Sequence, residues 1–413
     1  MKFQAPKGVS EYIPPRSSAF SWVRATLEKT ISAAGYDLLE LPIFEDTDLF
    51  NRIGASTDVV TKEMYTFEDR GGRSITLRPE GTVGALRAIN EHGLDRGSLP
   101  AKVYYCGPFF RAERPQRGRY RQFYSIGLEA VGTHDAALDA EVISIADAGF
   151  KKLGLTKYRL EMTSLGDAKS RAAHRVDLVS YIASLDLDEE TKERAKINPL
   201  RLFDDKREEV RTLMAKAPIL LDYLSPESKA NFVEVQRHLT AMGIEFTINP
   251  RMVRGLDYYT GTTFEFVHDL LGAQSGIGGG GRYDGLMGEI GGQDITGIGF
   301  GIGLDRALLA VEAEELIIPV SFASDLFIIP MGEAAKSLAL KAAADLRAQG
   351  FKVELAFGDR ALKTAMKAAD KSGARFSLVI GEEEIASGVV EIKEMLTGAT
   401  NSVRLDSLAS ALN

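Results

Sequence analysis

The chain has 413 residues, of which 45% are hydrophobic and 26% charged. This length suits two or three domains, and the balance is typical of a folded globular protein rather than a disordered or fibrous one. Fifty Lys and Arg against 58 Asp and Glu give a net charge of −8, which alone argues against a nucleic-acid partner. The single cysteine, Cys106, excludes an intrachain disulfide, and the five histidines lack metal-ligand spacing, so we expect no metal held by the protein alone.

The ends and the apolar stretches of the chain bear on its location. Residues 1–15 lack the apolar core of a signal peptide. Spanning a membrane takes a run of about 18 apolar residues, and the sequence contains no such run. We therefore expect a cytoplasmic protein with no membrane partner.

Apolar spacing predicts the first elements. Apolar residues recur at intervals of three and four from Phe20 to Ile31, which predicts a long helix. An extended segment follows at 38–43. It contains Pro42, and proline in a strand is typical of a sheet edge or an interface, where its missing N–H is not needed. A second helix is expected to begin near residue 81.

Two strands are predicted at 103–111 and 121–131, joined by a loop over 113–120. The second strand alternates between a polar and an apolar face. Its polar face holds Arg121, Phe123, Ser125, Gly127 and Glu129, and its apolar face holds Tyr124, Ile126, Leu128 and Ala130. We expect the apolar face to pack in the core and the polar face to line a site.

The middle of the chain changes character twice. Residues 168–235 are charged and lack strand alternation, which predicts a helical insertion with helices over 204–216 and 225–239. Strand patterns return at Phe246 and run through 254–267. Between Gly272 and Gly303, 14 of 32 residues are glycine. Because Ile, Phe and Leu alternate with them, we expect a strand whose bare backbone permits close approach rather than a flexible linker.

After Pro319 the pattern is typical of a small α/β domain. Strands are expected at 326–330, 352–356, 376–380 and 389–394, and helices at 334–349, at 362–371 and from 406.

Basic residues gather in the loop between the two predicted strands. They are Arg111, Arg114, Arg117, Arg119 and Arg121. Glu113 is the one acid among them, so the stretch carries 5 − 1 = +4. Guanidinium groups suit phosphate oxygens because they bind in a bidentate way and stay charged. A solvated surface loop is the alternative, but Phe123 and Glu129 on the adjoining strand favour a loop over a site.

Beside this loop, the sequence contains other segments that could bind a nucleotide. No P-loop occurs, and the G-x-G-x-x-G match that begins at Gly276 lacks the strand and helix context that would support it. Three segments place ionisable groups beside glycine or aromatic residues: Arg78–Thr82, Arg254–Tyr259 and Gly299–Arg306. Each alone is typical of a salt-bridged turn. Together with the arginine loop, they favour a functional site.

From end to end, the chain resembles class II aminoacyl-tRNA synthetases, and within that class the histidyl-tRNA synthetase family. The first helix and Pro42 resemble the first class motif, Phe110 to Glu129 the second, and Gly299–Arg306 the third. Arg254–Tyr259 and Gly279–Leu286 resemble two signatures peculiar to the histidine enzymes, and they are the specific part of the resemblance.

This resemblance implies a fold and a function. The fold is an α+β catalytic domain over 1–320 on a mixed, mostly antiparallel sheet, with the helical insertion at 168–235 and a C-terminal α/β anticodon-binding domain over 325–413. The function is ATP-dependent ligation of L-histidine to tRNA(His) through histidyl-adenylate, releasing AMP and pyrophosphate. A homodimer is also implied, because the first motif builds the dimer interface in this class.

Carried over by position, the resemblance assigns the ATP contacts. Arg111 would hold the α-phosphate, and Arg119 and Arg306 the distal phosphates. Phe123 would stack on the adenine, and Glu113 would lie near its amino group. Mg²⁺ would accompany the phosphates, bound largely through ATP and water.

The histidine contacts follow in the same way. They are Glu80, Thr82, Ser125, Glu129, Arg254, Tyr258 and Tyr259. Arg254, with Arg111, would be catalytic, because it matches the arginine beside the reaction centre. Glu80 and Thr82 would bind the ammonium group, and Glu129 and Tyr259 the imidazole, whose two nitrogens permit strong discrimination.

Three positions depart from the family pattern. Ser125 stands where Gln is usual, Tyr124 where His is usual, and Asp305 where Glu is usual. Serine is shorter by an amide arm, so its contact with the amino group would pass through a water or be left to Glu80 and Thr82.

The tRNA contacts are expected in two places. Arg114, Gln116 and Arg117 would meet the acceptor stem. In the C-terminal domain, Lys363, Lys367 and Lys371 recur every four residues on one helix face, flanked by Arg360 and Arg375. A lysine stripe is often only a solvated face. Nevertheless, residues 360–375 carry five bases against Asp370, 5 − 1 = +4, so local charge rather than the total of −8 points to tRNA.

Two rival functions fit less well. A silent paralogue that binds histidine and regulates ATP phosphoribosyltransferase typically lacks the C-terminal domain and erodes the ATP-binding arginines, whereas this chain keeps both. A class II enzyme for another amino acid conflicts with the signature Arg254–Tyr259.

Overall fold

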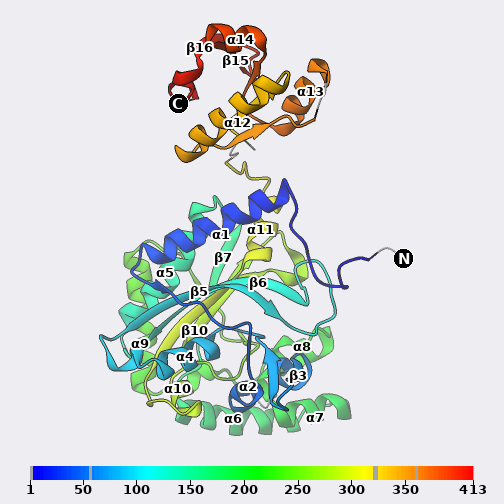
Figure 1. The fold of residues 1–413 in the computed structure, drawn as a ribbon. Helices are drawn as coiled ribbons and strands as arrows, with labels where there is room; N and C mark the ends of the chain where they lie inside the picture. Colours follow the sequence, from blue (N-terminus) through cyan, green and yellow to red (C-terminus); the bar gives the residue numbers. More distant parts are fainter. Residues whose placement is uncertain (1–2, 55–57, 320–323, 359–360, 413) are drawn as a thin grey trace. The chain divides into compact units, whose positions relative to one another are not determined.

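A computed structural model of the chain describes residues 3–54, 58–319, 324–358 and 361–412. The chain divides into two compact units, Met1–Ile317 and Ile318–Asn413 (Figure 1). Within the described residues, no helix has both the length and the apolar character needed to cross a membrane.

The larger unit is built on an eight-stranded sheet with the strand order β1-β5-β6-β11-β10-β9-β7-β8. Its strands are β1 (Asp37–Leu38), β5 (Ala101–Phe110), β6 (Gln122–Val131), β7 (Tyr158–Ser164), β8 (Thr247–Ile248), β9 (Thr260–His268), β10 (Gly276–Arg282) and β11 (Gly297–Gly303). Only the outermost pairs, β1 with β5 and β7 with β8, are parallel. The predicted mixed, mostly antiparallel sheet is confirmed.

Helices cover one face of this sheet. They are α1 (Arg16–Ser32), α5 (Ala136–Lys152), α9 (Pro226–Ala241) and α11 (Leu304–Ala313). α1 packs against α5 and α11, and α9 packs against α5 and β9. The residues that α1 buries include Val23, Leu27 and Ile31, so the predicted helix is confirmed together with its apolar stripe. Figure 1 shows α1 and α11 on one side of the sheet and α4 (Thr82–Glu91) with α10 (Leu286–Glu289) on the other.

Shorter elements complete this unit before β5. They are β2 (Phe44–Asp46), α2 (Thr47–Gly54), α3 (Asp58–Lys62), β3 (Tyr65–Glu68), β4 (Ser74–Leu77) and the 3-10 turn η1 (Leu94–Arg96). β2, β4 and β3 form a separate three-stranded sheet.

Between β7 and β8 the chain is helical. The elements are α6 (Ala168–Ala183), α7 (Glu189–Ile197), η2 (Pro199–Asp204), α8 (Glu208–Met214), η3 (Leu220–Tyr223) and then α9. Asp167, Asp188 and Ser225 begin α6, α7 and α9 by accepting a backbone N–H through their side chains. Leu178, Leu202 and Met214 belong to a separate apolar cluster that joins α6, η2 and α8. The helix expected at 204–216 is shorter, because η2 occupies its first residue.

Two expected strands are also shorter than predicted. The chain is irregular from residue 249 to 259, and β9 begins only at Thr260. A strand would send Tyr258 and Tyr259 to opposite faces, whereas both line the same cavity. In the segment 38–43, only Leu38 lies within a strand, and the backbone N–H of Leu39 donates to the carbonyl of Tyr104 in β5 at 2.7 Å.

The smaller unit has the five-stranded order β13-β12-β14-β15-β16. Its elements are β12 (Leu326–Pro330), α12 (Glu333–Ala348), β13 (Val353–Leu355), α13 (Leu362–Ser372), β14 (Phe376–Ile380), α14 (Glu382–Ser387), β15 (Val389–Glu394), β16 (Thr400–Arg404), η5 (Leu405–Ser407) and α15 (Leu408–Leu412). The predicted strands and helices are present. The short helix α14 and the edge strand β16 were not predicted, since β16 is mostly exposed and lacks an apolar face.

Candidate active site

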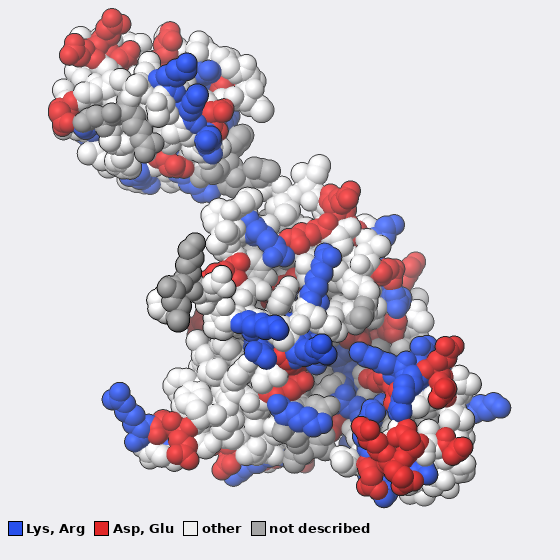
Figure 2. Space-filling view, turned by 90° about the vertical axis from the view of Figure 1, so that its right-hand side faces the viewer, with Lys and Arg blue, Asp and Glu red and all other residues white. Residues whose placement is uncertain are grey.

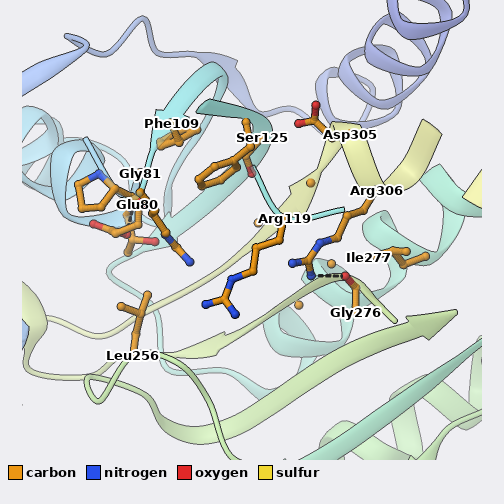
Figure 3. A pocket seen from close by; sticks show the side chains of 18 of the residues that line it. Glu80, Gly81, Phe109, Arg119, Ser125, Leu256, Gly276, Ile277, Asp305 and Arg306 are labelled. Carbon is orange, nitrogen blue, oxygen red and sulfur yellow. Dashed lines mark hydrogen bonds between the residues drawn. The ribbon is translucent and has the colours of Figure 1, made fainter. Parts of the chain in front are cut away.

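A cavity of about 270 Å³ opens on the larger unit. Its walls come from the start of α4, from β5, β6 and their connecting loop, from the irregular segment before β9, and from the glycine-rich strands β10 and β11. Of the predicted ATP-binding and histidine-binding residues, all except Glu129 line it. Figure 3 shows Arg119 reaching into the middle of the cavity, between Leu256 on one side and Arg306 on the other.

Arg111 and Phe123 form a flat wall of the cavity. The Arg111 guanidinium carbon lies 5.3 Å from the centroid of the Phe123 ring, and its Nε donates to the carbonyl of Pro79 at 2.9 Å. The other neighbour of Phe123 is Phe109, whose ring centroid lies 6.0 Å away. A guanidinium beside an aromatic ring can bind a phosphate while a base stacks on the ring.

Arg119 is held by two carboxylates. Its Nε pairs with Glu113 from the same loop, and its Nη2 lies 3.4 Å from Glu63 Oε1. Burial, followed by the neighbouring charge of Glu113, raises the pKa of Glu63. This arrangement presents a positive side chain to the cavity while keeping it in a fixed place.

Arg306 joins three segments around the cavity. Its nitrogens donate to the carbonyls of Gly118 at 2.7 Å and Gly276 at 2.8 Å and to Gln274 Oε1 at 3.0 Å. Figure 3 shows the bond to Gly276. A guanidinium has five N–H donors, so these three bonds leave two for an anion.

Arg254 is largely buried against the glycine strand. Its Nη1 lies 3.4 Å from Glu265 Oε1, and its Nε is buried without an acceptor among the described residues. A Cβ at Gly279 would lie 2.9 Å from both Nη1 and Nη2, so only a bare backbone leaves this guanidinium its place. A buried donor without an acceptor is costly, and a bound carboxylate or phosphate oxygen would satisfy it.

Glu80 and Tyr258 form the opposite wall. Both oxygens of Glu80 accept backbone N–H groups at the start of α4, from Thr82 at 2.7 Å and Val83 at 3.0 Å, and the Tyr258 hydroxyl donates to it at 3.4 Å. Burial raises the pKa of Glu80 in spite of these bonds. The nearby Arg78 is buried and donates to the carbonyls of Leu41 and Pro108, so its role is structural.

Glu129 lies one side chain away from the cavity. It is fully buried and accepts hydrogen bonds from the hydroxyls of Tyr105 at 3.0 Å and Tyr283 at 2.6 Å. A Cβ at Gly299 would lie 1.9 Å from Glu129 Oε2, so this glycine makes room for the carboxyl group. Tyr105 lines the cavity, and Glu129 therefore reaches it through that tyrosine. Its direct contact with imidazole stays a prediction.

The three departures from the family pattern have different surroundings. The Ser125 hydroxyl donates to the carbonyl of Ile302 at 3.0 Å, so its lone pairs remain to accept an N–H. The Tyr124 ring faces away from the cavity and packs against Phe20. Asp305 accepts the Tyr12 hydroxyl and the Tyr124 backbone N–H, the latter at 2.6 Å. The predicted alternation is confirmed for Phe123 and Ser125, which line the cavity, and for Ile126, Leu128 and Ala130, which are buried. Arg121, Gly127 and Glu129 were also expected to line the site, and they do not line this cavity.

Arg114, Gln116 and Arg117 are exposed on the loop between β5 and β6. The loop is a tight turn, in which Gln116 and Arg119 exchange two backbone hydrogen bonds of 3.0 and 2.9 Å. Figure 2 shows Lys and Arg side chains gathered across the middle of one face of the larger unit, and Asp and Glu side chains concentrated toward its lower right. A chain with a net negative charge thus presents a basic surface.

The lysine stripe belongs to the smaller unit. Lys363, Lys367 and Lys371 are exposed on α13, while the same helix buries Ala365 and Ala369. Arg375 instead donates to the carbonyl of Leu412 and lies over the Phe376 ring. The predicted flanking Arg360 lies outside the described residues.

Several further residues in or beside the site were not predicted, and four of them matter for its hydrogen bonds and ring contacts. They are Phe109, Tyr105, Glu265 and Tyr283. Tyr283 stands inside the glycine signature, where its sequence neighbourhood could have identified it. Tyr105 and Glu265 meet their partners only through the register of the sheet, in which Tyr105 lies opposite Gly127 and Glu265 opposite Gly279. Within the described residues, no group of three or more His, Cys, Asp or Glu side chains is placed to hold a metal ion.

A mostly antiparallel sheet with four arginines gathered at one cavity beside it, in a chain that also has a separate α/β unit, is typical of a class II aminoacyl-tRNA synthetase. Family models agree: one described as histidyl-tRNA synthetase matches residues 8–307, and one described as anticodon binding domain matches residues 325–413. The chain belongs to the histidyl-tRNA synthetase family.

Individual relatives are similar over their full length. The histidine–tRNA ligase of Saccharopolyspora erythraea is 57% identical over 99% of this chain and 98% of its own length. That of Rhodococcus opacus is 60% identical over 97% of this chain and 95% of its own length. Among solved structures, the apo histidyl-tRNA synthetase of S. aureus is 35% identical, covers all of both chains and has a TM-score of 0.84.

Proposed function

We propose that the cavity joins L-histidine to ATP and then to tRNA(His). In the first step, a carboxylate oxygen of histidine attacks the α-phosphorus of ATP, and the bond to pyrophosphate breaks. In the second, a hydroxyl at the 3′ end of the tRNA attacks the carbonyl carbon of histidyl-adenylate, and AMP leaves. The observation that carries this proposal is the gathering of Arg111, Arg119, Arg254 and Arg306 at one cavity that also contains Glu80, Tyr258 and Tyr259.

The arginines supply positioning and charge, which are the main needs of such a transfer. Arg254 and Arg111 act on the α-phosphate, where negative charge develops. Arg306 offers its two remaining donors to the distal phosphates, and Arg119 approaches them from the middle of the cavity. Phe123 stacks on the adenine, and Glu113 accepts from its amino group.

The amino-acid pocket lies between the start of α4 and the segment before β9. Glu80 and the lone pairs of Ser125 accept from the ammonium group, and Thr82 assists. Tyr258 and Tyr259 surround the imidazole. Glu129 sets the polarity of this end of the pocket through Tyr105. A pocket that pairs with both nitrogens of the imidazole ring favours histidine, because its own polar groups lose their hydrogen-bond partners when another amino acid binds.

Mg²⁺ fits the site only in company with ATP. The cavity offers scattered carboxylates such as Glu113 and Glu265 rather than a cage of three. We infer that phosphate oxygens and water supply most of the ligands, and that the ion offsets phosphate charge.

The proposed partners use surfaces outside the cavity. Arg114, Gln116 and Arg117 meet the acceptor stem, and Lys363, Lys367 and Lys371 of a C-terminal anticodon-binding domain, over 325–413, meet the anticodon arm. A second copy of the chain covers the apolar edge at Leu38, Ile43 and Phe44, each about half exposed. The enzyme acts in the cytoplasm.

Histidine-dependent exchange of pyrophosphate into ATP tests this function. The exchange measures only the first step, so it needs no tRNA. We expect exchange with histidine and with none of the other amino acids, and we expect Arg254→Ala to lower it by at least a hundredfold because the charge at the reaction centre is lost. Near-normal exchange in a folded Arg254→Ala protein would refute the role of Arg254, and no exchange with histidine in the unaltered chain would refute the function.

A further inference from the structure

The segment that carries Arg254 has little support from the sheet. Residues 249–259 connect β8 to β9 without joining either strand. The segment is also thin, since Arg254, Leu256 and Tyr259 line the substrate cavity on one side and a second cavity of about 330 Å³ on the other. This second cavity separates the segment from α6 and η2 of the helical insertion. The position of Arg254 therefore depends on its pair with Glu265 of β9 and on contacts between its segment and the helical insertion across the second cavity.

Two side chains of the insertion reach the segment. Asn198 Nδ2 donates to Asp257 Oδ1 at 3.1 Å, and Arg201 Nη2 donates to the carbonyl of Gly255 at 3.1 Å. Gly255 directly follows Arg254, and Asp257 directly precedes Tyr258. Each contact thus holds a residue that adjoins one whose side chain lines the substrate cavity: Arg201 bonds the backbone of Gly255, and Asn198 bonds the side chain of Asp257.

Both donors are fixed on the insertion side. Asn198 caps η2, because its Oδ1 accepts the backbone N–H of Leu200 at 3.2 Å. With the oxygen engaged, the amide must turn its NH₂ group toward the carboxylate of Asp257. Leu202, in the same 3-10 turn, is fully buried in the apolar cluster of the insertion. The turn is therefore anchored in the apolar cluster of the insertion.

We propose that Asn198 and Arg201 are positioning residues for histidine activation, through which the helical insertion holds the segment 254–259 against the substrate cavity. The inference rests on the proposed function of that cavity. It makes the insertion part of the first chemical step, which involves no tRNA. A shift of the insertion would move Gly255 and Asp257, and with them Arg254 and Tyr258.

Removing either contact gives the first test. The variants are Arg201→Ala and Asn198→Asp. Aspartate also caps helical turns well, so Asn198→Asp keeps the cap while setting a second carboxylate opposite Asp257. We expect each variant to raise KM for histidine about tenfold in pyrophosphate exchange, as for the loss of one hydrogen bond to a charged or fixed group, and to leave KM for ATP within about twofold.

The matched control is Arg175→Ala. Arg175 also donates to a backbone carbonyl, that of Lys196 at 3.2 Å, but it does so within the insertion. We expect wild-type KM values from this variant. A merely structural loss would lower the active fraction, and so kcat, without moving KM for histidine. Thermal midpoints of all variants identify that case.

A swap separates positioning from stability. In the double variant N198D/D257N, the carboxylate and the amide exchange places, so the donor–acceptor pair is restored. We expect KM for histidine to return to within about threefold of the wild type, with D257N alone completing the cycle. A wild-type KM for histidine in both Arg201→Ala and Asn198→Asp would overturn the proposal. So would an N198D/D257N protein whose KM for histidine is as high as that of N198D alone. If the wild type itself shows no exchange with histidine, the proposed function fails instead.

Discussion

The carboxyl group of Glu129 illustrates how a single residue is tuned by its burial. Burial raises its pKa to about 8 from an ordinary value of 4.5, although the hydroxyls of Tyr283 and Thr82 act in the opposite direction. At neutral pH the folded chain therefore keeps the proton, and the group can donate as well as accept. Gly299 is required for this burial, because any side chain at that position would occupy the space of the carboxyl group.

This residue predicts a pH dependence of stability. Between about pH 5 and 8 the unfolded chain has lost the Glu129 proton and the folded chain has kept it, so the free energy of unfolding falls as pH rises, by up to about 1.4 kcal/mol per unit. Below pH 4.5 and above pH 8 this contribution is flat. Glu129→Gln removes it, so urea unfolding at pH 5.5, 6.5 and 7.5 is expected to show a shallower slope than the wild type.

Glu141→Gln serves as the control for Glu129→Gln. Glu141 is partly exposed and pairs with Lys102 on the surface, so its replacement is expected to leave the slope unchanged. Equal slopes in the wild type and in Glu129→Gln would show that the buried carboxyl group does not keep its proton.

At the scale of elements, the segment before α1 contacts a residue of the site. The Tyr12 hydroxyl donates to Asp305, which also accepts the backbone N–H of Tyr124 and directly precedes Arg306. The Tyr12 ring stacks on Phe20 of α1, with ring centroids 4.2 Å apart. The first and the last parts of the larger unit are thus joined next to Arg306, the arginine that we propose to hold the distal phosphates.

Tyr12→Phe tests this connection. The substitution keeps the ring but leaves a buried carboxylate with one donor fewer. We expect a loss of roughly 1–3 kcal/mol in the free energy of unfolding and a several-fold rise in KM for ATP. Tyr124→Phe is the matched control, because Tyr124 reaches Asp305 through its backbone N–H and keeps that bond. A Tyr12→Phe protein as stable as Tyr124→Phe, with the same KM for ATP, would contradict the account.

Elements were predictable where one period dominates the sequence. The apolar stripe of α1 is a strong signal and is confirmed, and the alternation of β6 is confirmed where Phe123 and Ser125 line the cavity while Ile126 and Leu128 are buried. The segment 254–259 was wrongly predicted as strand, because the aromatic residues Tyr258 and Tyr259 have strand propensity, whereas both of their side chains line one cavity. The meeting of Glu129 with Tyr105 and Tyr283 depends on strand order and register, which no local pattern contains.

At the scale of the whole molecule, the family resemblance predicted a tRNA partner, which the total charge did not. The net charge of −8 argued against a nucleic acid, yet the exposed cations Arg114 and Arg117 and the lysines of α13 lie on two different units. A total charge averages such surfaces away, and only their distribution is informative. Each unit has its own apolar core, which is consistent with separate tasks of activating histidine and reading tRNA.

Aminoacylation of a mixed tRNA pool tests the central claim most directly. The chain is incubated with ATP, Mg²⁺, the pool and each labelled amino acid in turn, and the charged tRNA is then isolated and sequenced. The account predicts that only histidine is attached and that tRNA(His) is the charged species. Attachment of another amino acid, or charging of tRNAs without regard to their identity, would contradict it.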